Sequence, residues 1–297
     1  MQFIRDIYQS ARAVGRPVLS LEFFPTKTEE GERTLFDKTI PALLAMRPDF
    51  CSVTYGAGGS TRDKTLGIVD RIQREHQLPA MMHLTCVNST RDELRGVLDA
   101  ARARDIRNVL ALRGDPPGGG EFVKTEGGFE YSRELVAFVR EQGGFSIGTA
   151  GFPEGHITCT AGKHQDWEYL AEKVAAGADF VLTQLFFDNA DFYEFHDHMV
   201  GKLGVTVPIV PGIMPILSAG QTRRFVALCG AKLPAPFVQR LDELGDDDAA
   251  VTAFGIEYAT EQCASLLEYG VPGLHFYTLN KAHSIVQIAR NLGFVAK

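Results

Sequence analysis

Carboxylate side chains at two places in this sequence could take part in proton transfer. Glu22 lies in the apolar run 18–25, and Asp115 ends the tripeptide Arg113-Gly-Asp115. Burial beside Phe23 and Phe24 would force Glu22 either to find a partner or to raise its pKa, because burial disfavours the charged form. A carboxylic acid that keeps its proton near neutral pH is suited to general-acid catalysis. The alternative is a salt-bridged structural glutamate, or a cap for a following helix.

The Arg113-Gly-Asp115 tripeptide has the residue types of an anion-binding turn. A guanidinium is a planar fork that suits phosphate, and Gly114 lets the backbone approach a ligand closely. If Asp115 shares a cavity with Glu22, the two carboxylates tend to have divergent pKa values, which permits one acid and one anion. The alternative is a local Arg113–Asp115 ion pair that closes a turn.

His83 and His156 are each followed three residues later by a cysteine, a spacing that superficially suggests metal ligands. Residues three apart in a strand lie on opposite faces, so His83 and Cys86 should not converge. We therefore expect no metal site, and both histidines should donate to a ligand or to a backbone carbonyl. The five cysteines are widely spaced without a CxxC pair, so neither a disulfide framework nor a zinc site is expected.

Short apolar runs alternate with helical patterns along the chain, and this alternation would position the polar residues. The predicted strands are residues 18–23, 50–55, 80–86, 108–112, 145–150, 180–185, 207–211 and 274–278. The predicted helices include residues 62–75, 91–103, 134–141, 163–176, 219–228 and 249–269. Ser132 is the expected N-cap of the helix at 134–141, and residues 234–245 are read as an excursion. Eight strands favour closure into a parallel (β/α)8 TIM barrel.

Polar residues cluster where the predicted strands end, which is the active-site face of such a barrel. Seven of the eight strands contribute, with Glu22, Thr54, His83, Arg113, His156, Gln184 and Lys281 among the residues involved. This pattern indicates a large site. The glycine-rich segments at 55–60 and 118–120 lack the spacing of a dinucleotide-binding or phosphate-binding loop. Gln184 could pair with a fused-ring ligand, and Phe225 is either a core residue or a stacking platform.

Composition limits the other possibilities. The 297 residues are 45% hydrophobic and 23% charged, which fits one globular domain over residues 1–297 with an additional amphipathic N-terminal helix. The formal net charge of −7 argues against a nucleic-acid partner. Without a signal peptide or an apolar run of about 20 residues, no membrane association and a cytoplasmic location are expected.

Seven motifs in order resemble the methylenetetrahydrofolate reductase family. They are Leu21-Glu-Phe-Phe-Pro25, Ser52-Val-Thr-Tyr-Gly-Ala57, His83-Leu-Thr-Cys86, Leu110-Ala-Leu-Arg-Gly-Asp115, Thr183-Gln-Leu-Phe-Phe-Asp188, Pro211-Gly-Ile-Met-Pro215 and His275-Phe-Tyr-Thr-Leu-Asn280. The resemblance runs from about Ser20 to about Gly293. With nothing after Lys297, it looks like the short bacterial type without a regulatory domain.

The resemblance implies a barrel with FAD across its C-terminal face and a ping-pong reaction. NADH or NADPH (the sequence does not distinguish them) reduces the flavin, and methylenetetrahydrofolate then accepts hydride from flavin N5. Glu22 is implied as the acid that helps to open the folate ring, and Asp115 as a pterin contact that tunes the flavin. The implied substrate residues are Glu22, Gln184, Gln221, Phe225 and Lys281. The implied FAD residues are Thr54, His83, Arg113, Gly114, Asp115, Tyr131, Ala150, His156, Asp166 and Lys173. A homo-oligomer is also implied.

The sequence departs from the family pattern at Phe152, Tyr169 and Glu172. The resemblance puts the last two near the FAD adenosine, where an acidic residue would oppose the pyrophosphate and lower FAD affinity. The rival hypotheses are another FAD-dependent barrel that oxidises proline or a similar amine, and a folate-binding or flavin-binding protein without turnover. A Schiff-base aldolase needs a desolvated lysine inside a strand, and no predicted strand contains one.

Overall fold

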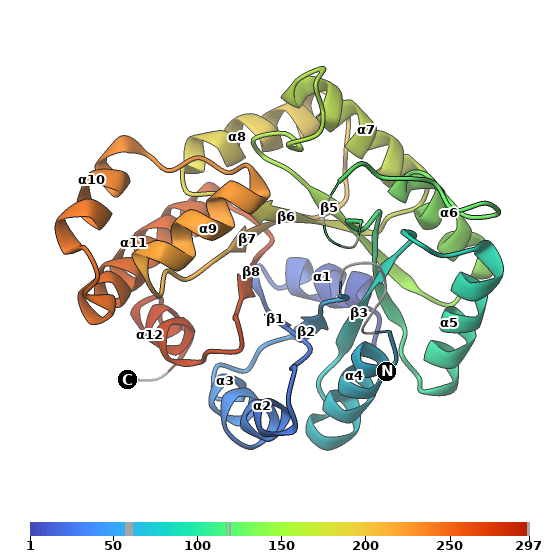
Figure 1. Cartoon of the computed structure of the whole chain (residues 1–297), viewed down its shortest axis with the longest axis horizontal. Helices are drawn as coiled ribbons and strands as arrows, with labels where there is room; N and C mark the ends of the chain where they lie inside the picture. Colours follow the sequence, from blue (N-terminus) through green and yellow to red (C-terminus); the bar gives the residue numbers. More distant parts are fainter. Residues whose placement is uncertain (57–61, 117, 119, 296–297) are drawn as a thin grey trace.

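The computed structural model describes residues 1–56, 62–116, 118 and 120–295. Eight parallel strands are hydrogen-bonded in chain order, and β8 pairs with β1, so the sheet is a closed barrel (Figure 1). The predicted (β/α)8 barrel is confirmed. The glycine-rich segment predicted after the second strand lies, from residue 57 on, outside the described residues.

The strands agree closely with those expected, and the boundaries of β1, β4 and β6 agree residue for residue. The strands are β1 (Val18–Phe23), β2 (Phe50–Val53), β3 (Ala80–Thr85), β4 (Asn108–Leu112), β5 (Ser146–Gly151), β6 (Phe180–Leu185), β7 (Ile209–Ile213) and β8 (Gly273–Tyr277).

Helices surround the barrel. The helices from the N-terminus to β5 are α1 (Ile4–Ala13), α2 (Glu29–Thr34), the π-helical turn η1 (Leu35–Thr39), α3 (Ile40–Leu44), α4 (Arg62–His76), α5 (Arg91–Ala103) and α6 (Ser132–Gln142). Those that follow are α7 (Lys163–Ala175), α8 (Asn189–Asp197), the π-helical turn η3 (His198–Lys202), α9 (Ala219–Cys229), α10 (Ala235–Leu244), α11 (Asp248–Tyr269) and α12 (His283–Asn291).

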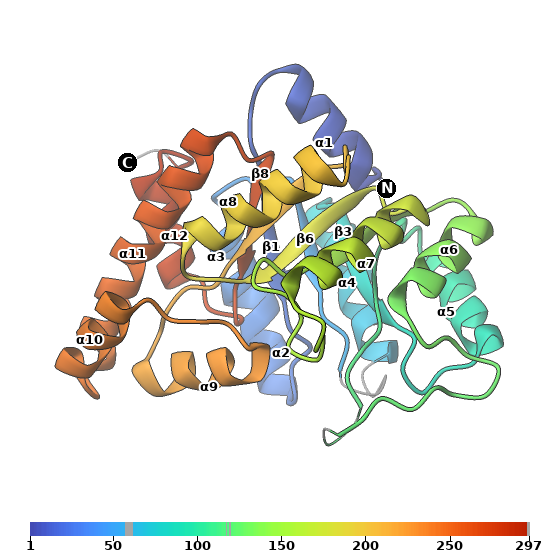
Figure 2. The same cartoon turned by 90° about the horizontal axis from the view of Figure 1, so that it is seen from above.

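Helix α1 closes one end of the barrel, as expected for an additional N-terminal helix. Its apolar face, with Ile4, Ile7 and Tyr8, is buried against the inward side chains Phe50 and Phe180. Burying each large apolar side chain contributes about 2 kcal/mol. The apolar side chains of α1 therefore fill this end of the barrel and stabilise it. Figure 2 shows α1 and α9 at opposite ends of the barrel, which leaves the α9 end for chemistry.

One local prediction is wrong, and one predicted excursion holds a helix that was not expected. Ser132 is the first residue of α6 and Tyr131 is the N-cap, because the Glu134 carboxylate accepts hydrogen bonds from the backbone N–H groups of Tyr131 and Glu130 at 2.9 and 2.8 Å. The predicted excursion at 234–245 contains helix α10. Its buried residues, Phe237 and Leu241, are four apart and therefore share one face.

The described residues contain neither a helix that is long and apolar enough to cross a bilayer nor a cluster of three or more His, Cys, Asp and Glu side chains suited to a metal ion. All five cysteines are free thiols. Polar side chains are buried inside the barrel nonetheless, among them Glu22, His83 and His275.

Candidate active site

Glu22 is the centre of a buried polar cluster at the end of β1. Its Oε2 accepts a hydrogen bond from Ser52 Oγ at 3.1 Å and lies 3.4 Å from His275 Nε2. His83 Nε2 is 3.2 Å from the same oxygen, but its N–H is not aligned for a hydrogen bond. Ser20 Oγ lies 2.9 Å from His275 Nδ1 on the far side of that ring. A carboxylate, two imidazoles and two hydroxyls are therefore in contact.

Strand register brings this cluster together. Glu22 pairs with Ser52 of β2 and with Tyr277 of β8, while Ser20 pairs with His275. Ser20 and Glu22 are two residues apart and therefore lie on the same face of β1. The four strands β8, β1, β2 and β3 are neighbours in the barrel. The cluster thus depends on barrel closure, because β8 contributes one of the two histidines.

The electrostatics of the cluster decide between the two outcomes left open for Glu22. Burial acts to raise the pKa of Glu22, but the adjacent His83 and His275 outweigh it and lower that pKa to about 2. Glu22 therefore finds partners and is an anion in this arrangement, because positive charge and hydrogen bonds favour the charged form. It does not cap the following helix, since Thr28 Oγ1 accepts from Gly31 N at 3.0 Å.

A second polar group lies between the β4, β5 and α7 elements. Lys173 Nζ donates to the carbonyl of Ala150 at 2.6 Å, and Asp166 Oδ2 accepts from the backbone N–H of His156 at 3.1 Å. Burial lowers the pKa of Lys173 to about 8 and raises that of Asp166, while each charge partly offsets the shift of the other. Burial likewise lowers the pKa of His156. Lys173 and His156 are therefore poorly solvated, and both carry groups that can donate hydrogen bonds.

Arg113 does not form the local ion pair with Asp115 that was the alternative for this turn. No ion pair within 4.0 Å joins Arg113 to Asp115, and the Arg113 guanidinium carbon lies 5.2 Å from the ring centre of Phe122. The charges of Arg113 and Asp115 both act on His156. The alternative of a simple turn-closing ion pair is therefore wrong, and the turn faces the second polar group.

Gly114 lies where no other residue type fits without strain. Its φ is +83°, and an added Cβ would lie 2.6 Å from Val87 Cγ1 and 2.7 Å from Thr85 Cβ. Both the conformation and the close approach therefore require glycine. Thr54, another predicted cofactor residue, directly follows β2. Its backbone N–H donates to Phe23 O at 2.9 Å.

The predicted substrate residues other than Glu22 lie on β6, on α9 and in the loop after β8. Gln184 is the penultimate residue of β6, and its side-chain oxygen accepts from Leu185 N at 2.9 Å. Gln221 and Phe225 are four apart on α9 and so share a face. Lys281 is exposed, and its ammonium forms no ion pair with a described carboxylate.

Asn280, next to Lys281, has a structural role. Its side-chain amide bonds to both backbone polar groups of Phe24, accepting at 3.0 Å and donating at 2.8 Å. Thr278 Oγ1 donates to Glu22 O at 2.6 Å in the same region. The β8 loop that carries Lys281 is therefore joined to the end of β1, directly beside the Glu22 cluster.

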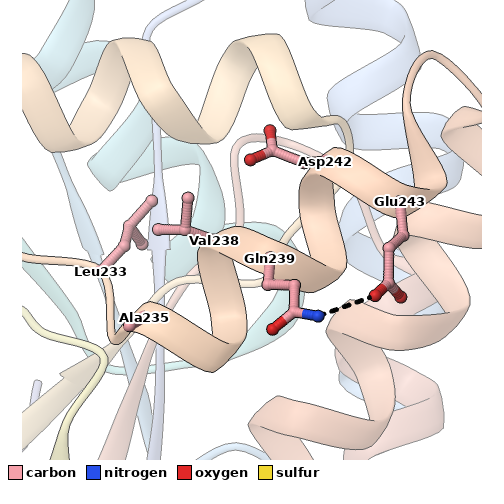
Figure 3. Close-up of a pocket in the computed structure, with 6 residues that line it drawn as sticks. All are labelled: Leu233, Ala235, Val238, Gln239, Asp242 and Glu243. Carbon is pink, nitrogen blue, oxygen red and sulfur yellow. Dashed lines mark hydrogen bonds between the residues drawn. The ribbon is translucent and has the colours of Figure 1, made fainter.

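A separate hollow occurs on the outer surface at α10. It is lined by Leu233, Ala235, Val238, Gln239, Asp242 and Glu243, and Gln239 Nε2 donates to Glu243 at 3.2 Å (Figure 3). None of the predicted catalytic, cofactor or substrate residues lines it. The chemistry is assigned to the barrel mouth, where buried ionisable groups converge.

The geometry can be compared with known proteins. A sequence profile described as methylenetetrahydrofolate reductase matches residues 7–293, nearly the whole chain. The chain belongs to the methylenetetrahydrofolate reductase family. The resemblance that the seven motifs indicated is therefore confirmed.

Two relatives in this family illustrate the extent of the match. Methylenetetrahydrofolate reductase (NADH) 1 of Arabidopsis thaliana is 42% identical over 301 residues, covering 98% of this chain and 50% of the relative. The 5,10-methylenetetrahydrofolate reductase of Escherichia coli is 38% identical over 284 residues, covering 95% of this chain and 93% of the relative. The chain spans about half the length of the plant relatives that it matches.

A solved structure shares the fold. It is an uncharacterized Clostridium thermocellum protein described as binding two copies of 5-methyl-5,6,7,8-tetrahydrofolic acid. It superimposes with a TM-score of 0.63 at 15% identity, covering 96% of this chain and 97% of that chain. At this identity the likeness supports the barrel fold alone.

The departures from the methylenetetrahydrofolate reductase pattern have a local explanation in one case. Glu172, the acidic residue expected to oppose a pyrophosphate, forms an ion pair with Arg133. Its negative charge is therefore compensated within the chain. Tyr131 and Tyr169 are both half exposed, at 49% each, beside this pair. Phe152 packs edge-on against His156, with ring centres 4.6 Å apart.

Sequence reasoning missed Ser20, Ser52 and His275 as members of the cluster. His275 and Ser52 begin two of the seven motifs, but neither was assigned a role. A signal existed in the alternation of each strand, since a polar residue at an inward position of an otherwise apolar strand must find a partner. Using it required the register between strands that are far apart in the sequence.

Proposed function

We propose that this chain reduces 5,10-methylenetetrahydrofolate to 5-methyltetrahydrofolate with NAD(P)H, using bound FAD in a ping-pong reaction. The observation that supports this most strongly is the buried Glu22–His83–His275 cluster at the mouth of a barrel of this family. Bound FAD would accept hydride from the nicotinamide and transfer it to the folate. The names of the plant relatives favour NADH as the donor to test first.

The residues present fit a flavin dinucleotide. His83 Nε2 is buried with no aligned hydrogen-bond partner among the described residues, so a bound ligand would satisfy it. The absence of a Cβ at Gly114 lets this turn pack directly on Val87 and Thr85, which would position Arg113 and Asp115 for the cofactor. Lys173 and Arg113 supply positive charge for a pyrophosphate, and Asp166 positions the loop of His156. We propose Thr54, Tyr131 and Ala150 as further contacts.

We propose that Glu22 delivers the proton that opens the folate ring. Because His275 Nε2 lies within hydrogen-bond distance of Glu22 Oε2, at 3.4 Å, a proton could pass between these two side chains without crossing solvent. Ser20, bonded to the other nitrogen of His275, fixes the orientation of that ring. Asp115 would contact the pterin as the second carboxylate. The anionic Glu22 of the structure is then the form after proton transfer.

The substrate side uses residues around the same mouth. Gln184 would exchange its bond to Leu185 N for the pterin edge, and Gln221 would contact the folate from α9. Phe225, one helical turn further along α9, would stack on either substrate. The rival aldolase has no support, because none of the eight strands contains a lysine.

Absorption spectroscopy tests the proposal. Purified protein is incubated with FAD, and unbound FAD is removed. The protein is then expected to show a flavin absorption band in the blue region of the visible spectrum. This band should bleach on anaerobic addition of NADH or NADPH. Addition of methylenetetrahydrofolate should then restore the band. Protein that takes up no FAD would contradict the flavin chemistry. Bleaching by proline in place of NAD(P)H would favour the amine-oxidising rival.

Lys281→Ala is expected to weaken folate binding about tenfold and to leave flavin reduction by NAD(P)H unchanged. The exposed ammonium lies on the loop that is joined to β1 and is suited to the carboxylate of the folate glutamate. A charge-assisted contact contributes about 1.5–3 kcal/mol. Steady-state KM for methylenetetrahydrofolate measures the effect, with Lys281→Arg as the conservative control. A large loss in the NAD(P)H step would reject this assignment.

A further inference from the structure

Residues 230–232, which directly follow α9, contact the loop that follows β5. Glu154 in this loop accepts from the backbone N–H of Lys232, with Oε1 at 3.0 Å and Oε2 at 3.3 Å. Lys232 Nζ lies 3.8 Å from the same carboxylate. Close by, Ile157 packs against Gly230, where an added Cβ would lie 3.0 Å from the Ile157 Cβ. Two contacts, one polar and one apolar, thus join the loop to the helix end.

Glu154 is buried although it takes no part in the proposed chemistry. Its side chain is 7% exposed. Burial, with a further contribution from the charge of Asp191, raises its pKa. A buried carboxylate is costly unless its oxygens are satisfied, and here both oxygens face one backbone N–H. Such a group fixes the relative position of the two segments that it joins.

Helix α9 is otherwise attached mainly through half-buried side chains. Of its 11 residues only Thr222 is buried. Phe225 and Val226 pack against an apolar cluster that includes Phe187 and Phe237, and Arg223 forms an ion pair with Asp242 of α10. Helix α9 lies across the barrel end opposite α1 (Figure 2). Its N-terminal end is held by Ser218, which caps it at Gln221 N (3.3 Å), and by Thr252 Oγ1 of α11, which donates to Leu217 O at 3.1 Å.

We infer that Glu154 is a positioning residue that holds α9, and with it Gln221 and Phe225, against the loop that carries His156. This inference rests on the proposed function, in which α9 contacts the substrates and His156 contacts the flavin. The contact lies where the two sides meet, because residues 152–155, Gln184 and residues 229–231 line one small cavity. Glu154 therefore sets the distance between the substrate helix and the flavin-side loop.

Hydrogen–deuterium exchange on the full chain tests the mechanical part. Glu154→Ala is expected to speed amide exchange in residues 219–229 about tenfold. It removes a hydrogen bond to a charged acceptor, and the loss of such a bond corresponds to a factor of about ten or more in an equilibrium constant. Glu154→Gln keeps an acceptor oxygen and should stay within about threefold of the parent protein. Lys232→Met keeps the backbone N–H and should do the same. Glu141→Ala, at an exposed position of α6, is the matched surface control.

Half-reaction kinetics test the functional part. For Glu154→Ala we expect KM for NADH and for methylenetetrahydrofolate to rise about tenfold while the limiting rates fall less than about threefold, with rescue by Glu154→Gln. The factor of ten corresponds to the hydrogen-bond loss already stated. A residue that only stabilises the fold would lower the unfolding temperature without this split between KM and rate.

Three results would overturn the inference. They are unchanged exchange in α9, exchange that rises equally in α10 and α11, and faster α9 exchange with unchanged KM values. If the parent protein neither binds FAD nor oxidises NADH, the proposed function fails first. The exchange comparison still reports whether Glu154 holds α9, so the two failures are distinguishable.

Discussion

Glu22→Gln is expected to reduce the folate half-reaction by about 10³-fold while flavin reduction by NAD(P)H remains within about threefold of the parent rate. Glutamine keeps the shape of the side chain and an oxygen that accepts from Ser52, so the cluster should stay folded. It removes the carboxylate through which the proton would reach the substrate. General-acid catalysis typically contributes 10²–10⁴-fold, and hydride transfer from NAD(P)H needs no proton from this residue.

Anaerobic stopped-flow absorbance separates the two half-reactions and measures this effect. The flavin content of the variant is the control for folding of the site. Ser52→Ala is a matched variant, because it removes a bond to Glu22 Oε2 but keeps the carboxylate. We expect a much smaller loss for that variant. Equal losses in both half-reactions of Glu22→Gln would identify Glu22 as a structural residue.

The pH dependence of the folate half-reaction should follow the cluster and not Glu22 alone. The two adjacent histidines lower the pKa of Glu22 to about 2, so Glu22 must receive a proton before it can act as an acid near neutral pH. His275→Gln should therefore alter the pH profile even though Glu22 is intact.

The fold was predictable because the barrel strands differ from their surroundings in the sequence itself. Residues 18–23 and 180–185 are mainly apolar, with two polar residues in each, as expected for strands buried on both sides. Helix α10 was missed because Pro234, its N-cap, and Pro236, its second residue, read as loop residues. A proline at the first turn is compatible with a helix, since the N–H that it lacks has no intrahelical partner there.

The burial of Glu22 was predictable from the sequence, but the partners that surround it and its charge state were not. The apolar neighbours of Glu22 indicated burial, and the structure has it 5% exposed. Its charge state depends on His83 and His275, which lie 61 and 253 positions away in the sequence. A sequence pattern that describes one strand holds no information about which side chains face it from β3 and β8. Only the closed register supplies those partners.

Gly114→Ala is expected to abolish tight FAD binding and to destabilise the protein by about 3 kcal/mol. The backbone of Gly114 has φ +83°, a conformation that costs a residue with a Cβ about 1–3 kcal/mol. The added Cβ would also meet Val87 Cγ1 at 2.6 Å and Thr85 Cβ at 2.7 Å. Overpacking of this kind costs about 1–3 kcal/mol. Relief of the clash would displace the turn that carries Arg113 and Asp115.

Gly118→Ala separates the two causes, because Gly118 has φ +76° and no atom of the described residues lies within 4 Å of an added Cβ. It shares the backbone strain of Gly114 but not the steric conflict. Thermal unfolding and FAD titration by flavin fluorescence, run on both variants, measure the difference. If Gly114→Ala binds FAD as tightly as Gly118→Ala and unfolds at the same temperature, the approach of β3 to this turn does not shape the flavin site. A selective loss in Gly114→Ala would mean that the β3–β4 contact sets the position of the turn against the cofactor.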